Sequence, residues 1–436
     1  MKNIKKFFAL LLVLLFTLNI FAQDSDIQND ERGLFSNDES TQEPKKEKKR
    51  FWDRYFEIGF DATVGLSNNY FHISDFLKEE IIINMDDINN GIGKGGLGLN
   101  ANVDADFFMN INTSIFRTSF FTDVQSNVNF ALEKGLINFL ANGNELDEEF
   151  SIGAGVGVSV YEENSFSLEI PISKLTIKAT PSYYIPVFYV PYTSATVTSV
   201  INEDGKISAK GNTTASVYSA LPLNNLGEFS ANMITDAFAH GGFDISIYAG
   251  YKLFENLEVG AFLTHVPIVP ANLSCTNKYT ATLDFTMDGI LSQISENGTV
   301  DTSNFNYELS DNIATEEDAI KLVRPFKIGF NANWKIFNSN ILVISPMIQF
   351  KFADFTLKNL LGFGFDYSIT AKSYLGPLVP AFTTSYIDSI FAQQLDIALN
   401  LRLFEIDFMI STQSTNLARS FAGSGLGVGV GFRFGI

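Results

Sequence analysis

The feature that most constrains how this chain folds is an alternation of apolar and polar residues over stretches of about ten residues. In Leu97–Phe107 every second residue is apolar, and the residues between them are Gly, Asn and Asp. Successive side chains of a β-strand point to opposite faces, so such a segment has one apolar face and one polar face. The apolar positions do not recur at i, i+3 and i+4, which excludes amphipathic helices.

The length of these segments separates a membrane strand from a soluble one. Strands of soluble proteins average about 5–6 residues, whereas a tilted membrane strand needs about 9–11. We therefore expect an all-β fold, a membrane-spanning antiparallel up-and-down β-barrel of roughly 14–16 strands, with short helical segments in loops or a plug. Besides Leu97–Phe107, the alternation recurs at Phe56–Leu66, Phe116–Val128, Phe150–Val160, Phe243–Leu253, Leu257–His265, Tyr279–Met287, Phe326–Ile336, Leu342–Phe352, Phe363–Ala371, Leu395–Leu403 and Leu426–Ile436.

The chain divides into three parts. Residues 1–22 are typical of a secretory signal peptide, with a basic start, the apolar run Phe7–Phe16 and a small residue, Ala22, at the end. Residues 23–50 are polar and charged and cannot bury a core, so we expect a disordered periplasmic leader. The barrel would occupy 51–436. This order predicts export through the Sec pathway to the outer membrane of a bacterial cell.

The connections predict which ends of the strands face the cell surface. Long loops of outer-membrane barrels lie outside and short turns in the periplasm. Short connections are expected at 254–256, 338–340, Phe404-Glu405 and Asp204-Gly205, and longer non-alternating stretches at 68–96, 131–149, 220–241, 289–324 and 374–394.

Three segments fit the pattern less simply. The last strand should end in the periplasm, and counting strands back from it to the short turn at 338–340 requires one more strand, which Phe382–Ile390 would supply from within a predicted loop. Thr299–Leu309 is a weak strand candidate. Lys178–Val190 contains Pro181 and Pro186, which cannot donate to a ladder, so we expect a bulge, a kink or an inserted loop there.

Three stretches resemble known outer-membrane proteins. Gly423–Ile436 is similar to the closing strand that the barrel-assembly machinery recognises, although it ends in Ile rather than an aromatic residue. Gly250–His265 and Arg324–Trp334 resemble poorly characterised outer-membrane β-barrels of spirochaetes, some of which are likened to the long-chain fatty-acid transporter barrels. The resemblance implies a fold, a compartment and an assembly partner, and it carries over no functional residue.

The residues that catalysis requires are scarce. The chain has one cysteine, Cys275, and three histidines, His72, His240 and His265, and it lacks the common nucleophile and metal-site motifs. We therefore expect no enzyme activity, no cofactor and no metal site. The formal net charge of −19 also argues against nucleic acid as a partner.

The polar faces carry charges of both signs. In a passive, porin-like channel for small solutes, opposed acidic and basic rows would create a field across the lumen. Alternatively, the charges pair with one another and fill a narrow barrel. The candidate lumen-lining residues are Asp104, Asp106, Arg117, Asp123, Lys252, Glu258, Lys327, Lys335, Lys351, Asp366, Lys372, Asp396 and Arg402.

Two other functions remain open. A transporter of hydrophobic ligands with a plugged lumen would use the aromatic residues placed on polar faces, namely Phe121, Tyr184, Phe188, Tyr248 and Phe262. The plug or gate candidates in an amphipathic segment, 221–240, are Leu226, Phe229, Met233 and Ile234. A surface adhesin or structural barrel would act through its acidic loops, 131–149 and 289–324. The expected partners are therefore outer-membrane lipid and either small solutes or a hydrophobic ligand.

Overall fold

The computed structural model describes most of the residues that follow the predicted leader. The residues that it describes are 54–72, 74, 84–143, 149–201, 207–220, 235, 237–273, 277–288, 305–313, 320–336, 341–352, 364–388 and 390–436. The predicted signal peptide and leader, the plug candidates, the turns at 204–205 and 338–340, and Cys275 lie outside the described residues.

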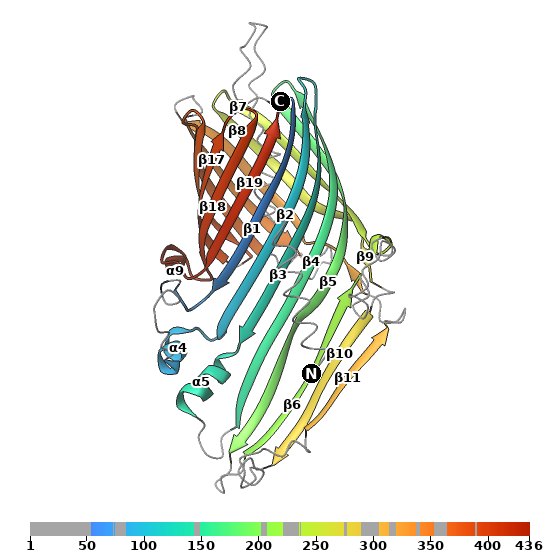
Figure 1. The fold of residues 1–436 in the computed structure, drawn as a ribbon, viewed down its shortest axis with the longest axis vertical. Coiled ribbons are helices and arrows are strands. Elements are labelled where there is room, and N and C mark those ends of the chain that lie inside the picture. The colour runs from blue at the N-terminus through green and yellow to red at the C-terminus, as the bar shows by residue number, and fades with distance from the viewer. Residues whose placement is uncertain are drawn as a thin grey trace.

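The strands form a closed antiparallel barrel of 14 strands (Figure 1). Each barrel strand pairs with the barrel strands that precede and follow it in the chain. Where strands of an extension of the sheet, described below, come between two barrel strands in the sequence, the two barrel strands still pair with each other. The all-β, up-and-down membrane barrel that the alternation predicts is therefore confirmed. The barrel strands are β1 (Phe56–Asn68), β2 (Leu97–Asn112), β3 (Arg117–Leu132), β4 (Glu149–Ile172), β5 (Leu175–Ile201), β7 (Gly242–Phe254), β8 (Leu257–Val269), β13 (Phe326–Ile336), β14 (Leu342–Phe352), β15 (Gly364–Ser373), β16 (Leu378–Ile387), β17 (Ile390–Asn400), β18 (Phe404–Ser414) and β19 (Leu426–Gly435).

The last strand closes the barrel against the first. β1 and β19 pair over ten residues in an unbroken register, from Glu57 opposite Gly435 to Leu66 opposite Leu426. The backbone N–H groups of Tyr55 and Phe56 both donate to the carbonyl of Ile436. Closure leaves no barrel strand with an unpaired edge, which a span through lipid requires because lipid cannot satisfy backbone groups.

The apolar positions of each strand face outward. Along β13, Phe330 and Trp334 are about half exposed, whereas Asn331 and Asn333 between them are buried. On β18, Phe408 is 62% exposed while the adjacent Asp407 is buried. Large apolar side chains that are exposed at every second position form a continuous outer belt, as expected for a surface in contact with lipid.

The turns at 113–116, 173–174, 255–256 and 401–403 and the C-terminus share one end of the barrel (Figure 1). The opposite end carries the tight β16–β17 hairpin and the long connections, which among the described residues contain the short helices α4 (Met85–Gly91), α5 (Lys134–Asn142) and α9 (Leu417–Phe421). Among the described residues, the structure contains no helix that is both long enough and apolar enough to cross a membrane. We call the two ends the short-turn end and the long-loop end.

At the long-loop end, the sheet continues beyond the barrel. β4 and β5 are 24 and 27 residues long, and only the first part of β5, Leu175–Tyr184, pairs with β7. Its last part, Thr196–Ile201, pairs with β6 (Ile207–Ser219), which continues to β10 (Asn277–Asp288) and β11 (Phe305–Ile313). A two-stranded ladder, β9 (Ala271–Asn272) with β12 (Lys321–Leu322), lies where the extension leaves the barrel.

Two segments singled out from the sequence belong to the long strand β5 and to this extension. Of the bulge, kink or inserted loop expected at Lys178–Val190, the structure has the bulge: the segment is part of β5, and its register slips once, where Val160 faces Phe188 and Tyr161 faces Pro186. This bulge accommodates Pro186. Tyr279–Met287 is a strand as predicted, yet it belongs to the extension and not to the barrel.

The predicted loop 374–394 and the turn at Phe404-Glu405 are wrong, whereas the strand predicted within that loop at Phe382–Ile390 is present over Phe382–Ile387. Most of 374–394 forms β16 and the start of β17, which are joined by a tight hairpin with Asp388 at positive φ. β17 ends at Asn400, before the predicted Leu403, and Phe404 already begins β18. The turn lies at 401–403, where Arg402 has a φ of 73° and provides the reversal.

Candidate functional site: the barrel lumen

The charges inside the barrel are separated by sign. Acidic side chains face the lumen mainly from β17, β18 and β1 to β4, whereas lysines face it from β5, β7 and β13 to β15. We call these groups the acidic arc and the basic arc. The acidic arc comprises Glu57, Asp61, Asp104, Asp106, Asp123, Glu163, Glu169, Asp396, Glu405 and Asp407, and the basic arc comprises Lys178, Lys252, Lys327, Lys335, Lys351 and Lys372.

The separation is not complete among the described residues. Arg117 and Arg433 lie within the acidic arc, and Asp244, Glu258 and Asp366 within the basic arc. Where the arcs meet, Glu169 stands opposite both Arg117 and Lys178 in the strand register. Arg117 Nη1 donates to Glu169 Oε1 at 2.7 Å. The lumen thus combines local ion pairs with an overall charge difference between two walls.

An ion-pair network lines the lumen near the short-turn end. Arg433 on β19 donates to both carboxylate oxygens of Asp61 on β1, and its Nη1 lies 2.5 Å from Glu405 and 3.1 Å from Asp407. Arg54 donates to Glu57 at 2.6 Å. Buried charges are tolerated when they are paired in this way. The network joins the first strand of the barrel to the last two.

A second network lies at the long-loop end, where β5 parts from β7. Arg324 donates through Nε and Nη2 to the two oxygens of Asp244, both at 2.9 Å, and through Nη1 to Glu163. Its guanidinium also lies 4.9 Å from the ring centroid of Tyr184. Tyr184 Oη donates to the carbonyl of Leu322 at 2.9 Å. Arg324 therefore spans β5 and links β4 to β7.

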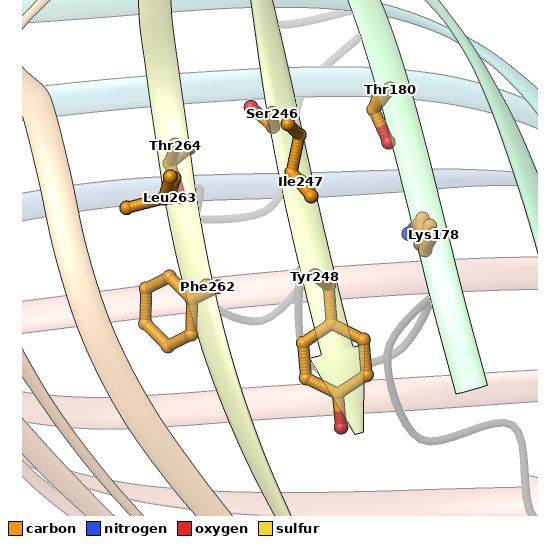
Figure 2. Close-up of a pocket in the computed structure, with 8 residues that line it drawn as sticks. All are labelled: Lys178, Thr180, Ser246, Ile247, Tyr248, Phe262, Leu263 and Thr264. Carbon is orange, nitrogen blue, oxygen red and sulfur yellow. The ribbon is translucent and has the colours of Figure 1, made fainter. Parts of the chain in front are cut away.

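Midway along the barrel, aromatic side chains narrow the lumen. Tyr248 on β7 and Phe262 on β8 lie side by side over the lumen face, as Figure 2 shows, next to a cavity of only about 10 Å³. Both pack with Met347 of β14, and Ile387 at the β16–β17 hairpin packs against them. The ring of Phe262 occupies the space that a side chain at Gly329 would need. These four residues form the constriction cluster.

A larger cavity, of about 460 Å³, opens at the long-loop end. On the lumen face of β1 to β4 it is bordered by Ser67, Asn100, Asn129 and Ser159. Tyr189 and Tyr192 of β5 border it on one side. On the other side stand the β16–β17 hairpin and the end of β18, through Asp388, Ile390 and Thr415. The hairpin thus separates this outer cavity from the constriction cluster.

The predicted lumen residues lie where the alternation puts them, with one exception. All but Arg402 are on strands, at inward positions of the register. Arg402 lies in the exposed turn between β17 and β18. Phe121, Tyr184, Tyr248 and Phe262 also face inward. Phe188 does not, because the bulge shifts it opposite Val160, and it packs with Val158 and Val190 on the other face.

The three histidines lie apart from one another, each beside a backbone carbonyl. His72 Nδ1 lies 3.4 Å from the carbonyl of Ala422 and His240 Nδ1 lies 3.0 Å from that of Asn272, and His265 is buried with its Nδ1 3.3 Å from the carbonyl of Pro325. The described residues contain no group of His, Cys, Asp and Glu side chains that could hold a metal ion.

Sequence comparison identifies no relatives: no family profile and no curated protein match the chain. Among solved structures, the toluene transporter TodX of Pseudomonas putida is 11% identical over 87% of this chain and 89% of its own, with a TM-score of 0.46. The toluene transporter TbuX of Ralstonia pickettii is 9% identical over 88% and 90%, with a TM-score of 0.43. The translocator domain of the autotransporter NalP of Neisseria meningitidis is 8% identical over 94% and 93%, with a TM-score of 0.31. TM-scores this low carry no information about function.

Proposed function

We propose that this protein is a channel of the bacterial outer membrane that passes small polar solutes. The observation that carries the proposal is the separation of the lumen charges into an acidic arc and a basic arc. Opposed charges across a narrow aqueous passage order water, and they select solutes by charge and size. The larger number of carboxylates predicts that cations pass more readily than anions.

The compartment follows from the outer surface and the connections. A closed barrel with an apolar belt satisfies the two demands of a lipid bilayer, a fully paired backbone and an apolar exterior. The short-turn end, with the chain terminus, would face the periplasm, and the long-loop end would face outward. The outer cavity would then receive solutes from outside the cell.

The constriction cluster is the gate in this proposal. Phe262 and Tyr248 project into the lumen and pack with Met347 and Ile387, so we expect only small or brief currents from the refolded protein in planar bilayers. Removing the ring by Phe262→Ala should increase the single-channel conductance severalfold. Leu263→Ala is the matched control, because Leu263 is the outward neighbour on the same strand and its loss leaves the lumen unchanged.

The opposite results would reject the channel. A wild-type protein that is folded and inserted but conducts no ions, with Phe262→Ala equally silent, would exclude an aqueous passage. Equal increases for Phe262→Ala and Leu263→Ala would show that a general loosening of the barrel, and not the constriction cluster, controls the current.

One observation favours a transporter of hydrophobic ligands instead. Phe108 and Phe121 stand opposite each other on the lumen face of β2 and β3, which gives the lumen a second aromatic surface besides the constriction cluster. Such a transporter would retain apolar ligand or detergent through purification and would conduct poorly in both the wild-type and Phe262→Ala proteins. Extraction and mass spectrometry of bound small molecules distinguish the two functions.

The extension of the sheet favours an additional role at the surface. β6, β10 and β11 carry the chain well beyond the barrel (Figure 1). If the protein acted as an adhesin, removing residues 277–313 would abolish binding to its partner while the barrel stayed folded. The channel proposal expects the same deletion to leave the ion selectivity unchanged.

A further inference from the structure

Two polar atoms on the wall of the outer cavity have no hydrogen-bond partner in the part of the chain that the structure describes. Ser67 Oγ and Asn100 Oδ1 are both buried and both unpaired, and the two residues face each other directly across β1 and β2. Asn100 is held in place because its Nδ2 donates to Asn127 and Asn129, at 3.2 Å and 2.7 Å. Its carbonyl oxygen is therefore fixed and left to accept a hydrogen bond.

Buried polar groups in proteins are nearly always paired, so an adjacent unpaired hydroxyl and amide oxygen indicate a missing partner. The position on a cavity wall means that the partner can come from outside the chain. One ligand hydroxyl can donate to Asn100 Oδ1 and accept from Ser67 Oγ at the same time. A purely apolar ligand would leave both atoms unsatisfied, and the site would therefore discriminate against it.

Tyrosine rings provide the apolar part of the same cavity. The Tyr192 ring lies across Gly155, where an added Cβ would collide with it, and a Cβ at Gly157 would make tight contacts of 3.3–3.4 Å with Tyr192, so the absence of a side chain at Gly155 allows the ring to lie close to the sheet. Tyr189 stands opposite Ser159. An aromatic face beside hydroxyl and amide groups suits a ligand with an apolar ring face and polar edges.

The charge of the cavity wall narrows the ligand class further. Among the described lining residues, Asp388 alone is charged, and Lys351 pairs with it. The remaining polar atoms belong to neutral Ser, Thr, Asn and Tyr side chains and to the backbone. A volume of about 460 Å³ lies within the range of small-molecule sites.

We propose that the outer cavity binds a small neutral saccharide, with one hydroxyl bridging Ser67 and Asn100 and the sugar ring against Tyr192. This ligand class rests on the proposed channel function, for which the cavity is the entrance. It also explains why most polar side chains on the cavity wall are neutral.

The test uses the full-length mature protein, refolded in a detergent without a sugar headgroup. Binding of maltose, glucose, glucose 6-phosphate and toluene would be measured by equilibrium dialysis. We expect maltose or glucose to bind, and glucose 6-phosphate and toluene to bind at least tenfold more weakly. Ser67→Ala, Asn100→Ala and Tyr192→Leu should each weaken the binding of the sugar by about tenfold or more. Asn142→Ala and Tyr251→Leu, which change the same residue types at exposed positions elsewhere, should not.

Three results would overturn the ligand assignment: no sugar binding to folded protein, tighter binding of toluene than of sugar, or sugar binding that the three cavity variants leave unchanged. Conductance of the same preparations separates this proposal from the channel function. Currents without sugar binding would reject the saccharide and keep the channel. Sugar binding that depends on Ser67 and Asn100 without currents would support the site and reject the channel.

Discussion

Arg433 on the last strand donates to both carboxylate oxygens of Asp61 on the first strand, at 3.1 Å and 3.0 Å. The strand register places these residues at the seam of the barrel, and Asp61 is completely buried. The bond thus adds a charged side-chain link where the backbone ladder closes.

The seam predicts a specific loss of stability. Arg433→Gln leaves Asp61 buried without its main cation, so we expect the free energy of unfolding to fall by about 3–5 kcal/mol. Urea unfolding in detergent, followed by the change in gel mobility of the folded barrel, measures it. Arg402→Gln, in the exposed turn, is the matched control and should change little. Equal losses for both variants would contradict a role of the seam.

A glycine in the same network gives a second prediction. A Cβ at Gly431 would meet the carboxylates of Asp61 and Asp407, whereas a Cβ at Gly93 would meet nothing within 4 Å. We expect Gly431→Ala to lower the free energy of unfolding by about 1–3 kcal/mol, because the paired carboxylates cannot move away without breaking their bonds. Gly93→Ala should be neutral in the same urea titration. A neutral Gly431→Ala would show that the network can rearrange freely.

The bridge between β4 and β7 predicts an effect on gating. Arg324→Gln removes the contacts of the guanidinium with Glu163 and Asp244 and should make the single-channel current noisier, with more frequent openings. The control is Lys321→Gln, an exposed position three residues earlier. Unchanged current records for Arg324→Gln would mean that the bridge is static under the conditions of measurement.

The two charged arcs predict opposite changes in ion selectivity. Lys335→Gln combined with Lys372→Gln weakens the basic arc and should raise the cation-to-anion permeability ratio on the order of a few-fold. Asp396→Asn weakens the acidic arc and should lower the ratio. Reversal potentials in a salt gradient give the values, and Glu255→Gln in an exposed turn serves as the control. Shifts in the same direction for both arcs would contradict a field across the lumen.

The sequence predicts which face of the sheet a side chain occupies better than it predicts the residue at which a strand ends. Alternation along β2 predicts that Asp104 and Asp106 share one face of the strand, and in the register they stand opposite Thr63 and Asp61 of β1, because a period of two admits only one alternative face. The alternation predicts the wrong end for β17, Leu403 instead of Asn400, because Leu399, Leu401 and Leu403 continue the apolar alternation through the turn. Arg402 reverses the chain there through its positive φ, which the alternation does not reveal.

The alternation of apolar and polar residues gives no information about contacts between segments that are distant in the sequence. A single extra residue at the bulge moved Phe188 to the opposite face from the one that parity assigned. Arg324 lies outside any strand, so nothing in its neighbourhood indicated that it would bridge Glu163 and Asp244. The separation of charge into arcs likewise required the order of strands around the barrel, which one sequence does not contain.

The central claim is that residues alternate between lipid and lumen along each strand, and β13 tests it most directly. In a Cys275→Ser background, spin labels placed singly from Ile328 to Trp334 would report their contact with oxygen, which concentrates in lipid, and with a water-soluble nickel complex. We predict two periodic signals out of phase, with oxygen contact greatest at Ile328, Phe330, Ala332 and Trp334. Equal contact at successive positions, or a period near 3.6 residues, would contradict the barrel.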